Sequence, residues 1–194
     1  MTSFTLFLKG PDVLEDDHMD ALFEAGCDDA VFGERDGAQY ATFDREAPSF
    51  CAALTSAIDQ LTSAVPGLEI MRVEPDEVVT MAAIADRVGV SREQVRLLSN
   101  GQRGPGGFPS PVSYVDRKTR LWYWPEVSRW FQENGKAKTE VGDGADLVAA
   151  LNAALALRGH VARLRDREDL ALVARAVEGM PGDTGRARAC RRAW

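Results

Sequence analysis

The stretch TMAAIADRVGVSREQVRLLS, residues 80–99, decides the fold because it holds two short amphipathic segments on either side of one glycine. Thr80 is a residue type that caps helix N-termini, and Gly89 is the type that ends a helix in the left-handed conformation. Between them, apolar residues recur at helical spacing. They are Met81, Ile84, Ala85 and Val88. The pattern predicts a short helix that packs this face inward and ends at Gly89.

A second helix is predicted directly after a Gly-Val turn. Ser91, with Gln94 three residues later, forms the capping-box pattern that opens helices. Val95 and Leu98 lie on one face of this segment, with Val90 beside them. Two short helices joined by a tight turn predict a helix-turn-helix. An ordinary helical hairpin stays open as an alternative at this point, because short patterns recur by chance.

The outer side of the second helix carries residue types that contact DNA. Arginine can bind guanine through two parallel hydrogen bonds, glutamine can bind adenine, and a serine hydroxyl can hold a phosphate oxygen. The side chains left for this outer side are Arg92, Gln94, Arg96 and Ser99. We therefore expect contact between this helix and a DNA groove.

A glycine-rich turn and a hairpin are predicted next. Residues 101–107 read GQRGPGG, and residues 108–112 read FPSPV. The second segment must run extended because each proline disfavours helix in the residue before it. Strands at 112–115 and 121–124 can then pair across residues 116–120, so the hairpin tip carries three cations.

The hairpin leads into a helix that closes the unit. Proline is favoured at the first helical position, which Pro125 occupies, and Val127, Trp130 and Phe131 are expected to turn inward. The tryptophans expected in the core, rather than in stacking on bases, are Trp122, Trp124 and Trp130.

Taken in order, these segments resemble the winged helix-turn-helix family of phage-type AlpA and excisionase regulators, relatives of the MerR DNA-binding head. The matching segments are Ala83-Ile84-Ala85, Gly89-Val90-Ser91, Phe108-Pro109-Ser110-Pro111-Val112 and the run from Trp122 to Trp130. The resemblance covers residues 80–131. It implies that the second helix lies in the major groove and that the wing reaches phosphate or the minor groove. The insertion at 101–107 departs from the family, and the layout as a whole resembles bacterial DNA-binding proteins.

The predicted DNA-binding set divides into base readers and backbone contacts. Arg92, Gln94 and Arg96 are expected to read bases. The residues expected to position the DNA backbone are Ser91, Arg103, Arg117, Lys118 and Arg120, and the predicted DNA-binding set also includes Ser99 and Thr119. We expect no catalytic residue, metal site or cofactor, because neither His18 nor His160 has a nucleophile or ligand pattern beside it.

Residues 1–77 predict a βαββαβ unit of the ferredoxin-like, α+β kind. Strand patterns occupy 4–8, 30–33, 39–43 and 68–73, and helical patterns occupy 13–25 and 50–61. Asp36-Gly37 is a strong hairpin signal between the second and third strands. The first helix is expected to bury one apolar face, made of Leu14, Met19, Leu22 and Phe23. Other topologies with the same order of elements stay open.

The charge is distributed unevenly along the chain. Residues 1–79 hold 17 acidic and 4 basic side chains, a net charge of −13, whereas residues 80–138 hold 5 acidic and 10 basic ones, a net charge of +5. A phosphate backbone responds to the face that it meets rather than to the total of −7. We therefore expect nucleic acid at the middle segment and not at the N-terminal unit.

The C-terminal part predicts a linker over 132–143, helices within 145–180 and a basic tail at 181–194. The helical periodicity runs through Leu147, Leu151, Ala154 and Leu155, and then Val161, Leu164, Leu170, Val173 and Val177. Such a stripe can pack against the same chain or against a second copy, and both alternatives stay open. The expected domains are therefore residues 1–77, 80–134 and 145–180, followed by the tail.

A cytoplasmic protein is expected, because the N-terminus lacks the features of a secretory signal and no apolar run is long enough to span a membrane. The three cysteines, Cys27, Cys51 and Cys190, lie far apart and show no CxxC pattern, so we expect reduced thiols rather than a zinc site.

The function expected from the sequence is a sequence-specific, double-stranded DNA-binding transcriptional regulator without enzymatic activity. Its partners would be double-stranded DNA, with a homodimer and a protein partner of the acidic unit left open. One alternative is an antitoxin-like or adaptor protein whose acidic unit binds a protein. Another is an excisionase-type architectural factor that bends DNA.

Overall fold

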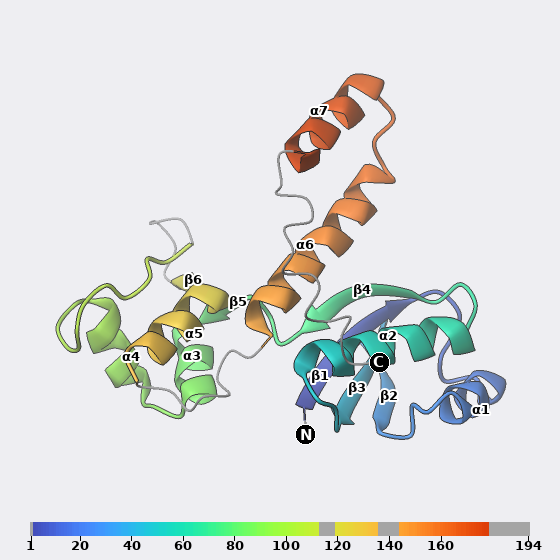
Figure 1. The fold of residues 1–194 in the computed structure, drawn as a ribbon, viewed down its shortest axis with the longest axis horizontal. Coiled ribbons are helices and arrows are strands. Elements are labelled where there is room, and N and C mark those ends of the chain that lie inside the picture. Colours follow the sequence, from blue (N-terminus) through green and yellow to red (C-terminus); the bar gives the residue numbers. More distant parts are fainter. Residues whose placement is uncertain (1, 113–118, 136–143, 179–194) are drawn as a thin grey trace. The chain divides into compact units, whose positions relative to one another are not determined.

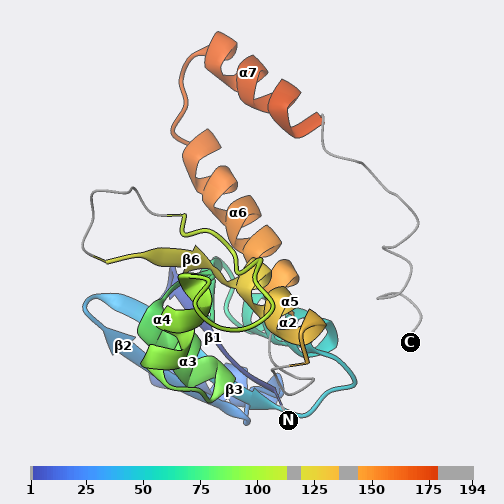
Figure 2. The same cartoon turned by 90° about the vertical axis from the view of Figure 1, so that its left-hand side faces the viewer.

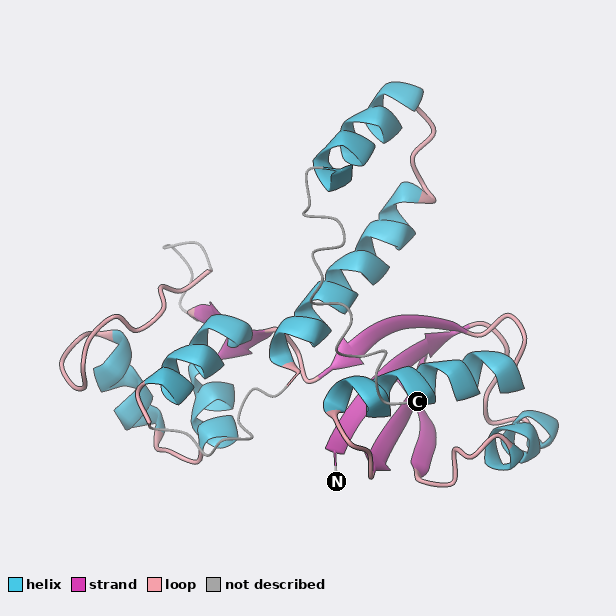
Figure 3. Cartoon of the chain, viewed as in Figure 1, coloured by secondary structure: helices cyan, strands magenta, loops and turns pink. Residues whose placement is uncertain are grey.

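The computed structural model describes residues 2–112, 119–135 and 144–178 and has a mixed α+β fold (Figures 1 and 3). These described residues form seven helices, a four-stranded sheet and a two-stranded sheet. The chain divides into two compact units. One contains the residues up to Arg72 together with the described residues from Asn152 onward, and the other runs from Val73 to Leu151.

The first unit begins with alternating strands and helices in the predicted order. They are β1 (Thr2–Lys9), α1 (Asp16–Glu24), β2 (Ala30–Arg35), β3 (Ala38–Arg45), α2 (Phe50–Ala64) and β4 (Glu69–Glu74). The sheet order is β2-β3-β1-β4, with β3 antiparallel to both β1 and β2. Non-consecutive neighbours in this order require crossovers, which α1 and α2 supply.

The β2–β3 hairpin has the turn that the sequence predicts. Arg35 pairs with Ala38, which leaves a two-residue loop made of Asp36 and Gly37. Both have positive φ, 53° and 78°. This is the backbone that an Asp-Gly hairpin loop favours, because aspartate tolerates the left-handed region and glycine has no Cβ.

The core of this unit lies between α2 and the sheet, across which α2 runs (Figure 1). Phe4 on β1 stacks on Phe43 of β3, with 5.3 Å between ring centroids, and meets Phe50 of α2 edge-on at 5.9 Å. Leu54 and Leu61 of α2 are buried beside them. The predicted spacing of apolar residues on α2 therefore marks the face that packs on the sheet.

The predicted apolar face of α1 is wrong in part. Only Leu22 of the four expected residues is buried, whereas Phe23 is 68% exposed and Leu14 and Met19 are exposed as well. The helix begins at Asp16, so Leu14 precedes it. Phe23 lies about 100° around the helix from Leu22 and shares its outward direction with Met19, because residues four apart lie on one side. The spacing of Met19, Leu22 and Phe23 is helical, but of these three residues only Leu22 faces the core.

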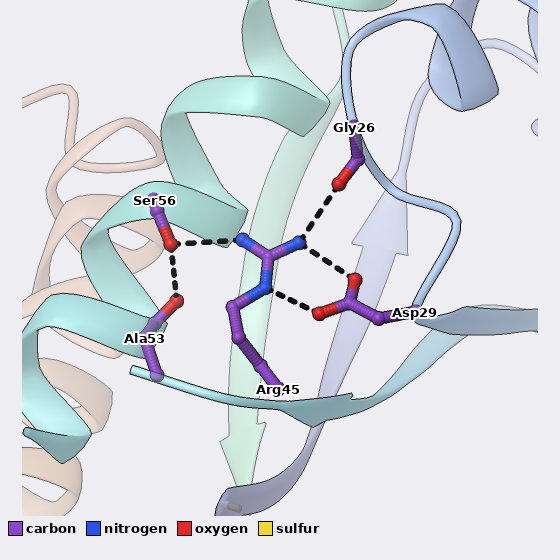
Figure 4. Close-up of polar contacts among 5 residues, drawn as sticks. All are labelled: Gly26, Asp29, Arg45, Ala53 and Ser56. Atoms are coloured by element: carbon purple, nitrogen blue, oxygen red, sulfur yellow. Dashed lines mark hydrogen bonds and ion pairs between the residues drawn. The ribbon is translucent and has the colours of Figure 1, made fainter. Parts of the chain in front are cut away.

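A buried arginine ties three segments of this unit together (Figure 4). Arg45, at the end of β3, donates two hydrogen bonds to the Asp29 carboxylate, 2.7 Å from Nε and 2.8 Å from Nη2. It also donates to the Ser56 hydroxyl on α2 and to the Gly26 carbonyl after α1. The bonds to Asp29 raise the pKa of Arg45, so the guanidinium stays charged although it is buried.

Replacing this arginine is expected to destabilise the first unit. Arg45→Met leaves the mostly buried Asp29 carboxylate without its partner. The free energy of unfolding should fall by roughly 2–4 kcal/mol, because the unpaired charge remains desolvated. The measurement is hydrogen exchange of the β3 and α2 amides, together with urea unfolding followed by circular dichroism. Arg35→Met is the matched control, because Arg35 is 85% exposed. Equal stability of the two variants would contradict the role given to Arg45.

The second unit is built from short elements (Figure 2). They are β5 (Val78–Thr80), α3 (Met81–Val88), α4 (Arg92–Ser99), β6 (Leu121–Tyr123) and α5 (Trp124–Glu133). Their apolar side chains form one buried cluster of Val79, Ile84, Ala85, Val95, Leu98, Trp122, Trp124, Val127, Trp130, Phe131 and Ala145. The three tryptophans are thus core residues, as expected. The faces of α3, α4 and α5 that were predicted to turn inward also contribute residues to this cluster.

This unit contains a strand pairing beyond the predicted hairpin. β6 pairs with β5, a strand that the sequence analysis did not identify, in the register Val78↔Tyr123, Val79↔Trp122 and Thr80↔Leu121. Of the strand predicted at 112–115, only Val112 lies within the described residues, and its N–H donates to the Leu121 carbonyl at 2.8 Å. Trp124, predicted as the end of a strand, is instead the first residue of α5.

Two further helices follow, α6 (Ala145–Val161) and α7 (Arg167–Glu178). The buried residues of α6 are Ala145, Val148, Ala149 and Asn152. The predicted stripe is therefore shifted, because Leu147 is exposed and Leu151 and Leu155 are only half-buried. Val161 ends α6 and Leu164 lies between the helices, while Leu172 and Val177 of α7 are exposed. Among the described helices, none combines the length and the apolar character that crossing a membrane requires.

The cysteines differ from the expectation at one position. Cys27 is a free thiol, and burial raises its pKa, so it stays protonated at neutral pH. Cys51, on α2, is in a disulfide, so the expectation of a reduced thiol is wrong there.

Candidate nucleic-acid interface

The two helices α3 and α4 are held at their ends by the caps that the sequence predicts. The Thr80 hydroxyl accepts a hydrogen bond from the Ala83 N–H at 3.2 Å, and the Ser91 hydroxyl accepts one from the Gln94 N–H at 3.1 Å. Gly89 ends α3 with φ 73°, a backbone in which a residue with a Cβ is strained. The turn between the helices is therefore fixed by local chemistry.

The buried face of α4 determines which side chains remain for a ligand. Val95 and Leu98 are buried, so Arg92, Glu93 and Arg96 are exposed on the opposite side. Gln94 and Ser99 are half-buried. The hydroxyl of Ser99 donates to the Arg96 carbonyl at 3.1 Å, and that of Ser91 caps the helix, so both have a helical role besides any contact with DNA.

A hollow of about 510 Å³ lies beside α4. It is lined by Thr80, Met81, Ala82, Arg92, Arg96, Asn100, Thr119, Arg120 and Trp122. Four of the predicted site residues therefore meet here. Three of the lining side chains are guanidinium groups, and no carboxylate is among these nine residues. The first turn of α3 adds the positive end of a helix dipole. Such a surface attracts an anion.

The pairing of β5 with β6 explains why these residues meet. β5 ends at Thr80, which is also the cap of α3, and Thr80 lies opposite Leu121. Arg120 precedes Leu121 and is thereby placed beside the first turn of α3, where Thr80 and Ala82 line the hollow with it. The lining residues that sequence reasoning missed are Thr80, Met81, Ala82, Asn100 and Trp122. Recognition of strand β5 would have placed Thr80 and the first turn of α3 beside Arg120.

Arg96 is paired with a residue that the sequence analysis did not include. The Glu93 carboxylate accepts hydrogen bonds from Nε of Arg96 at 2.7 Å and from Nη2 at 2.6 Å. These bonds lower the pKa of Glu93 and raise that of Arg96, so the pair stays ionised at neutral pH. An acidic residue in the first turn of a helix is common because it suits the helix dipole, so its place alone gave no functional signal.

Two other arginines of the basic segment have structural partners. Arg87 donates to the Asp76 carbonyl at 2.9 Å, and its guanidinium lies 4.9 Å from the Trp124 ring centre. Burial lowers its pKa. Arg129 forms an exposed ion pair with Asp146. Among the described residues of this segment, the positive charge that remains for a ligand is thus at Arg92, Arg96 and Arg120 around the hollow and at Arg103.

The glycine-rich segment is anchored to the core at its end. The Trp130 indole N–H donates to the Gly106 carbonyl at 3.0 Å, and the Trp122 indole donates to the Pro109 carbonyl at 3.2 Å. Phe108 packs edge-on against Trp130. Arg103 is exposed in this segment and does not line the hollow. Two further predicted backbone contacts, Arg117 and Lys118, lie outside the described residues.

Loss of the indole N–H is expected to loosen this segment. Trp130→Phe keeps an aromatic ring in the core but removes the bond to Gly106, at a cost of about 1–3 kcal/mol. Trypsin cleavage after Arg103, followed by mass spectrometry, should become faster. The arginines of α4 are an internal control, because their helix keeps its caps. Unchanged cleavage at Arg103 would show that the anchor is not needed.

The chain shows no arrangement typical of a metal site in its described residues, where no three His, Cys, Asp or Glu side chains gather. His18 is engaged locally, with Nδ1 2.6 Å from the Asp12 carbonyl and 3.6 Å from the Glu15 carboxylate. Comparisons of the chain with protein-family models, curated proteins and solved structures found no match.

Proposed function

We propose that this protein is a sequence-specific regulator that binds double-stranded DNA, acts in the cytoplasm and catalyses no reaction. The observation that carries the proposal is the hollow between the first turn of α3, α4 and Arg120. Three arginines line it, of which Arg96 is paired with the Glu93 carboxylate, and the lining itself contains no carboxylate. An anion with several oxygens fits this chemistry, and the phosphate backbone of DNA presents such anions at regular spacing.

The proposed division of contacts follows from where the side chains lie. Arg92 and Arg120, with the first turn of α3, would hold a backbone phosphate in the hollow. Gln94 and Arg96 would then reach base edges in the major groove, because they lie on the part of α4 that follows Arg92. This moves Arg92, expected from the sequence to read bases, to the backbone group.

The order of the elements also supports a specific fold for each of the two units. A helix, a glycine turn and a second helix, followed by the β5–β6 pair and α5, suit a winged helix-turn-helix of the AlpA and MerR-head type. The sheet order β2-β3-β1-β4 favours a ferredoxin-like first unit. A homodimer belongs to the proposal too, supported by the exposed Leu172 and Val177 of α7, since regulators of this kind often bind paired half-sites.

The first test of this function is selection from DNA. The purified chain is incubated with fragmented genomic DNA of its source at about 0.15 M salt, and the retained fragments are sequenced. Recovery of one shared motif would support the proposal, and paired half-sites about one helical turn apart would support the dimer. Retention of no fragment above background would overturn it.

Charge removal in the hollow is expected to weaken binding to every DNA sequence alike. Arg92→Ala and Arg120→Ala each remove one phosphate contact, so the slope of log K against log salt should fall by about 1 for each. Fluorescence anisotropy with a selected and a random duplex measures this. Arg35→Ala removes the same charge from the first unit and should leave the slope unchanged. A loss confined to the selected duplex would contradict the phosphate role.

A second candidate function is protein binding by the first unit, and the exposed face of α1 favours it. Met19 and Phe23 lie one turn apart, and the acidic side chains around them include Asp16, Asp20 and Glu24. Residues 12–24 contain six acidic and no basic side chains. An aromatic anchor inside an acidic rim suits a basic partner with an apolar side chain to insert.

Substitution at this face is expected to abolish such binding without changing DNA binding. Phe23→Ser removes the apolar anchor, whereas Val31→Ser, at a similarly exposed residue of β2, is the matched control. The three chains are immobilised in parallel, and proteins retained from a lysate of the source are identified and titrated again in purified form. A basic protein bound by wild type and Val31→Ser but not by Phe23→Ser is the expected result. Equal retention by all three would rule out this face.

A further inference from the structure

The ion pair on the outer surface of α4 leaves part of its arginine available. Glu93 and Arg96 are three residues apart on the helix, and their side chains are 62% and 46% exposed. The carboxylate contacts Nε and Nη2, the side edge of the guanidinium. Among the described residues, the hydrogen bonds of the Arg96 guanidinium go to Glu93 alone.

A guanidinium group has two edges that can make paired hydrogen bonds. Its five N–H groups lie in one plane, two of them on the side edge and two on the end edge formed by Nη1 and Nη2. Because Glu93 occupies the side edge, the end edge remains for a second planar acceptor. Guanine offers such an acceptor in the major groove, where O6 and N7 lie side by side.

The ion pair also limits what else Arg96 can do. A free arginine on a helix surface samples many rotamers and can bind any nearby phosphate, whereas a guanidinium held by two bonds has lost part of that freedom already. The negative charge of Glu93 offsets the positive charge of Arg96 and repels phosphate oxygens. Arg96 is therefore less suited to the backbone than Arg92 or Arg120, which line the same hollow.

We propose that Glu93 is a positioning residue that holds the side edge of Arg96 so that its end edge reads a guanine. The inference rests on the proposed DNA-binding function. An exposed pair of this spacing adds only a few tenths of a kcal/mol to a helix. A merely structural role would thus leave sequence choice unchanged, and this difference makes the proposal testable.

The experiment compares the unaltered 194-residue chain with four variants by selection from a random-sequence duplex library. The variants are Glu93→Ala, Glu93→Gln, Arg96→Ala and Glu93→Ala/Arg96→Ala. Asp86→Asn is the matched control, because it removes one exposed negative charge from α3 away from Arg96. Each guanine of the selected motif is then replaced singly. For every variant, the dissociation constant for the replaced duplex is divided by that for the selected duplex, and this ratio measures discrimination at the guanine. Affinity for a random duplex is measured in parallel.

The expected result has two parts that move in opposite directions. Glu93→Ala lowers discrimination at one guanine by roughly 5-fold or more, while affinity for the random duplex rises because a negative charge has been removed. Arg96→Ala loses discrimination at the same guanine, and the double variant adds no further loss. Glu93→Gln, whose amide oxygen can accept one bond, lies between wild type and Glu93→Ala. Asp86→Asn keeps full discrimination.

The failure of this inference can be distinguished from failure of the proposed function. If wild type selects a motif and Glu93→Ala keeps its guanine discrimination, Glu93 is not a positioning residue, although the protein binds DNA. If Glu93→Ala and Asp86→Asn gain random affinity equally without loss of discrimination, only net charge has acted, and the inference falls as well. If wild type enriches no sequence and binds no duplex, the DNA-binding function and this inference are both overturned.

Discussion

The antiparallel pairing of β5 with β6 is the constraint on which the second unit depends. It joins two three-residue strands that are about forty residues apart in sequence, and its central pair sets Trp122 opposite Val79 in the core. The same register sets Leu121 opposite Thr80, the cap of α3. One pairing therefore fixes both the largest buried side chain of the unit and the position of Arg120 beside the first turn of α3.

The sequence predicts those parts of the fold that local chemistry fixes. Thr80 and Gly89 specify where α3 begins and ends, and Ser91 specifies where α4 begins, because caps and left-handed turns depend on neighbouring residues alone. The Asp-Gly turn specifies the β2–β3 hairpin for the same reason. β5 has only three residues and exists because β6 pairs with it, so no periodicity in its own residues could reveal it. The hollow could not be predicted from the sequence for the same reason, since Thr80 and Arg120 meet only through that pairing.

The exposure of side chains, and the charge that they leave available to a ligand, could be learned only from the folded structure. The spacing of Met19, Leu22 and Phe23 is helical, but spacing cannot tell which side meets the core, and only Leu22 does. Counts of charge in a segment likewise overestimate what is available to a ligand. Arg87 is used to hold the Asp76 carbonyl and to cover Trp124, and Arg129 is paired with Asp146. Two of the basic side chains that the structure describes are thus used by the fold rather than left for a ligand.

Two arginine–carboxylate pairs with nearly the same geometry have different consequences in this chain. Arg45 gives Asp29 its side edge and also donates to Ser56 and Gly26 inside the unit, so all three of its nitrogen atoms donate to the fold. Arg96 gives Glu93 the same edge, but on an exposed helix. Burial makes the first pair costly to break, because a charge without its partner would be desolvated. Exposure removes that cost from the second pair, which is therefore better explained by what the oriented guanidinium can bind than by stability.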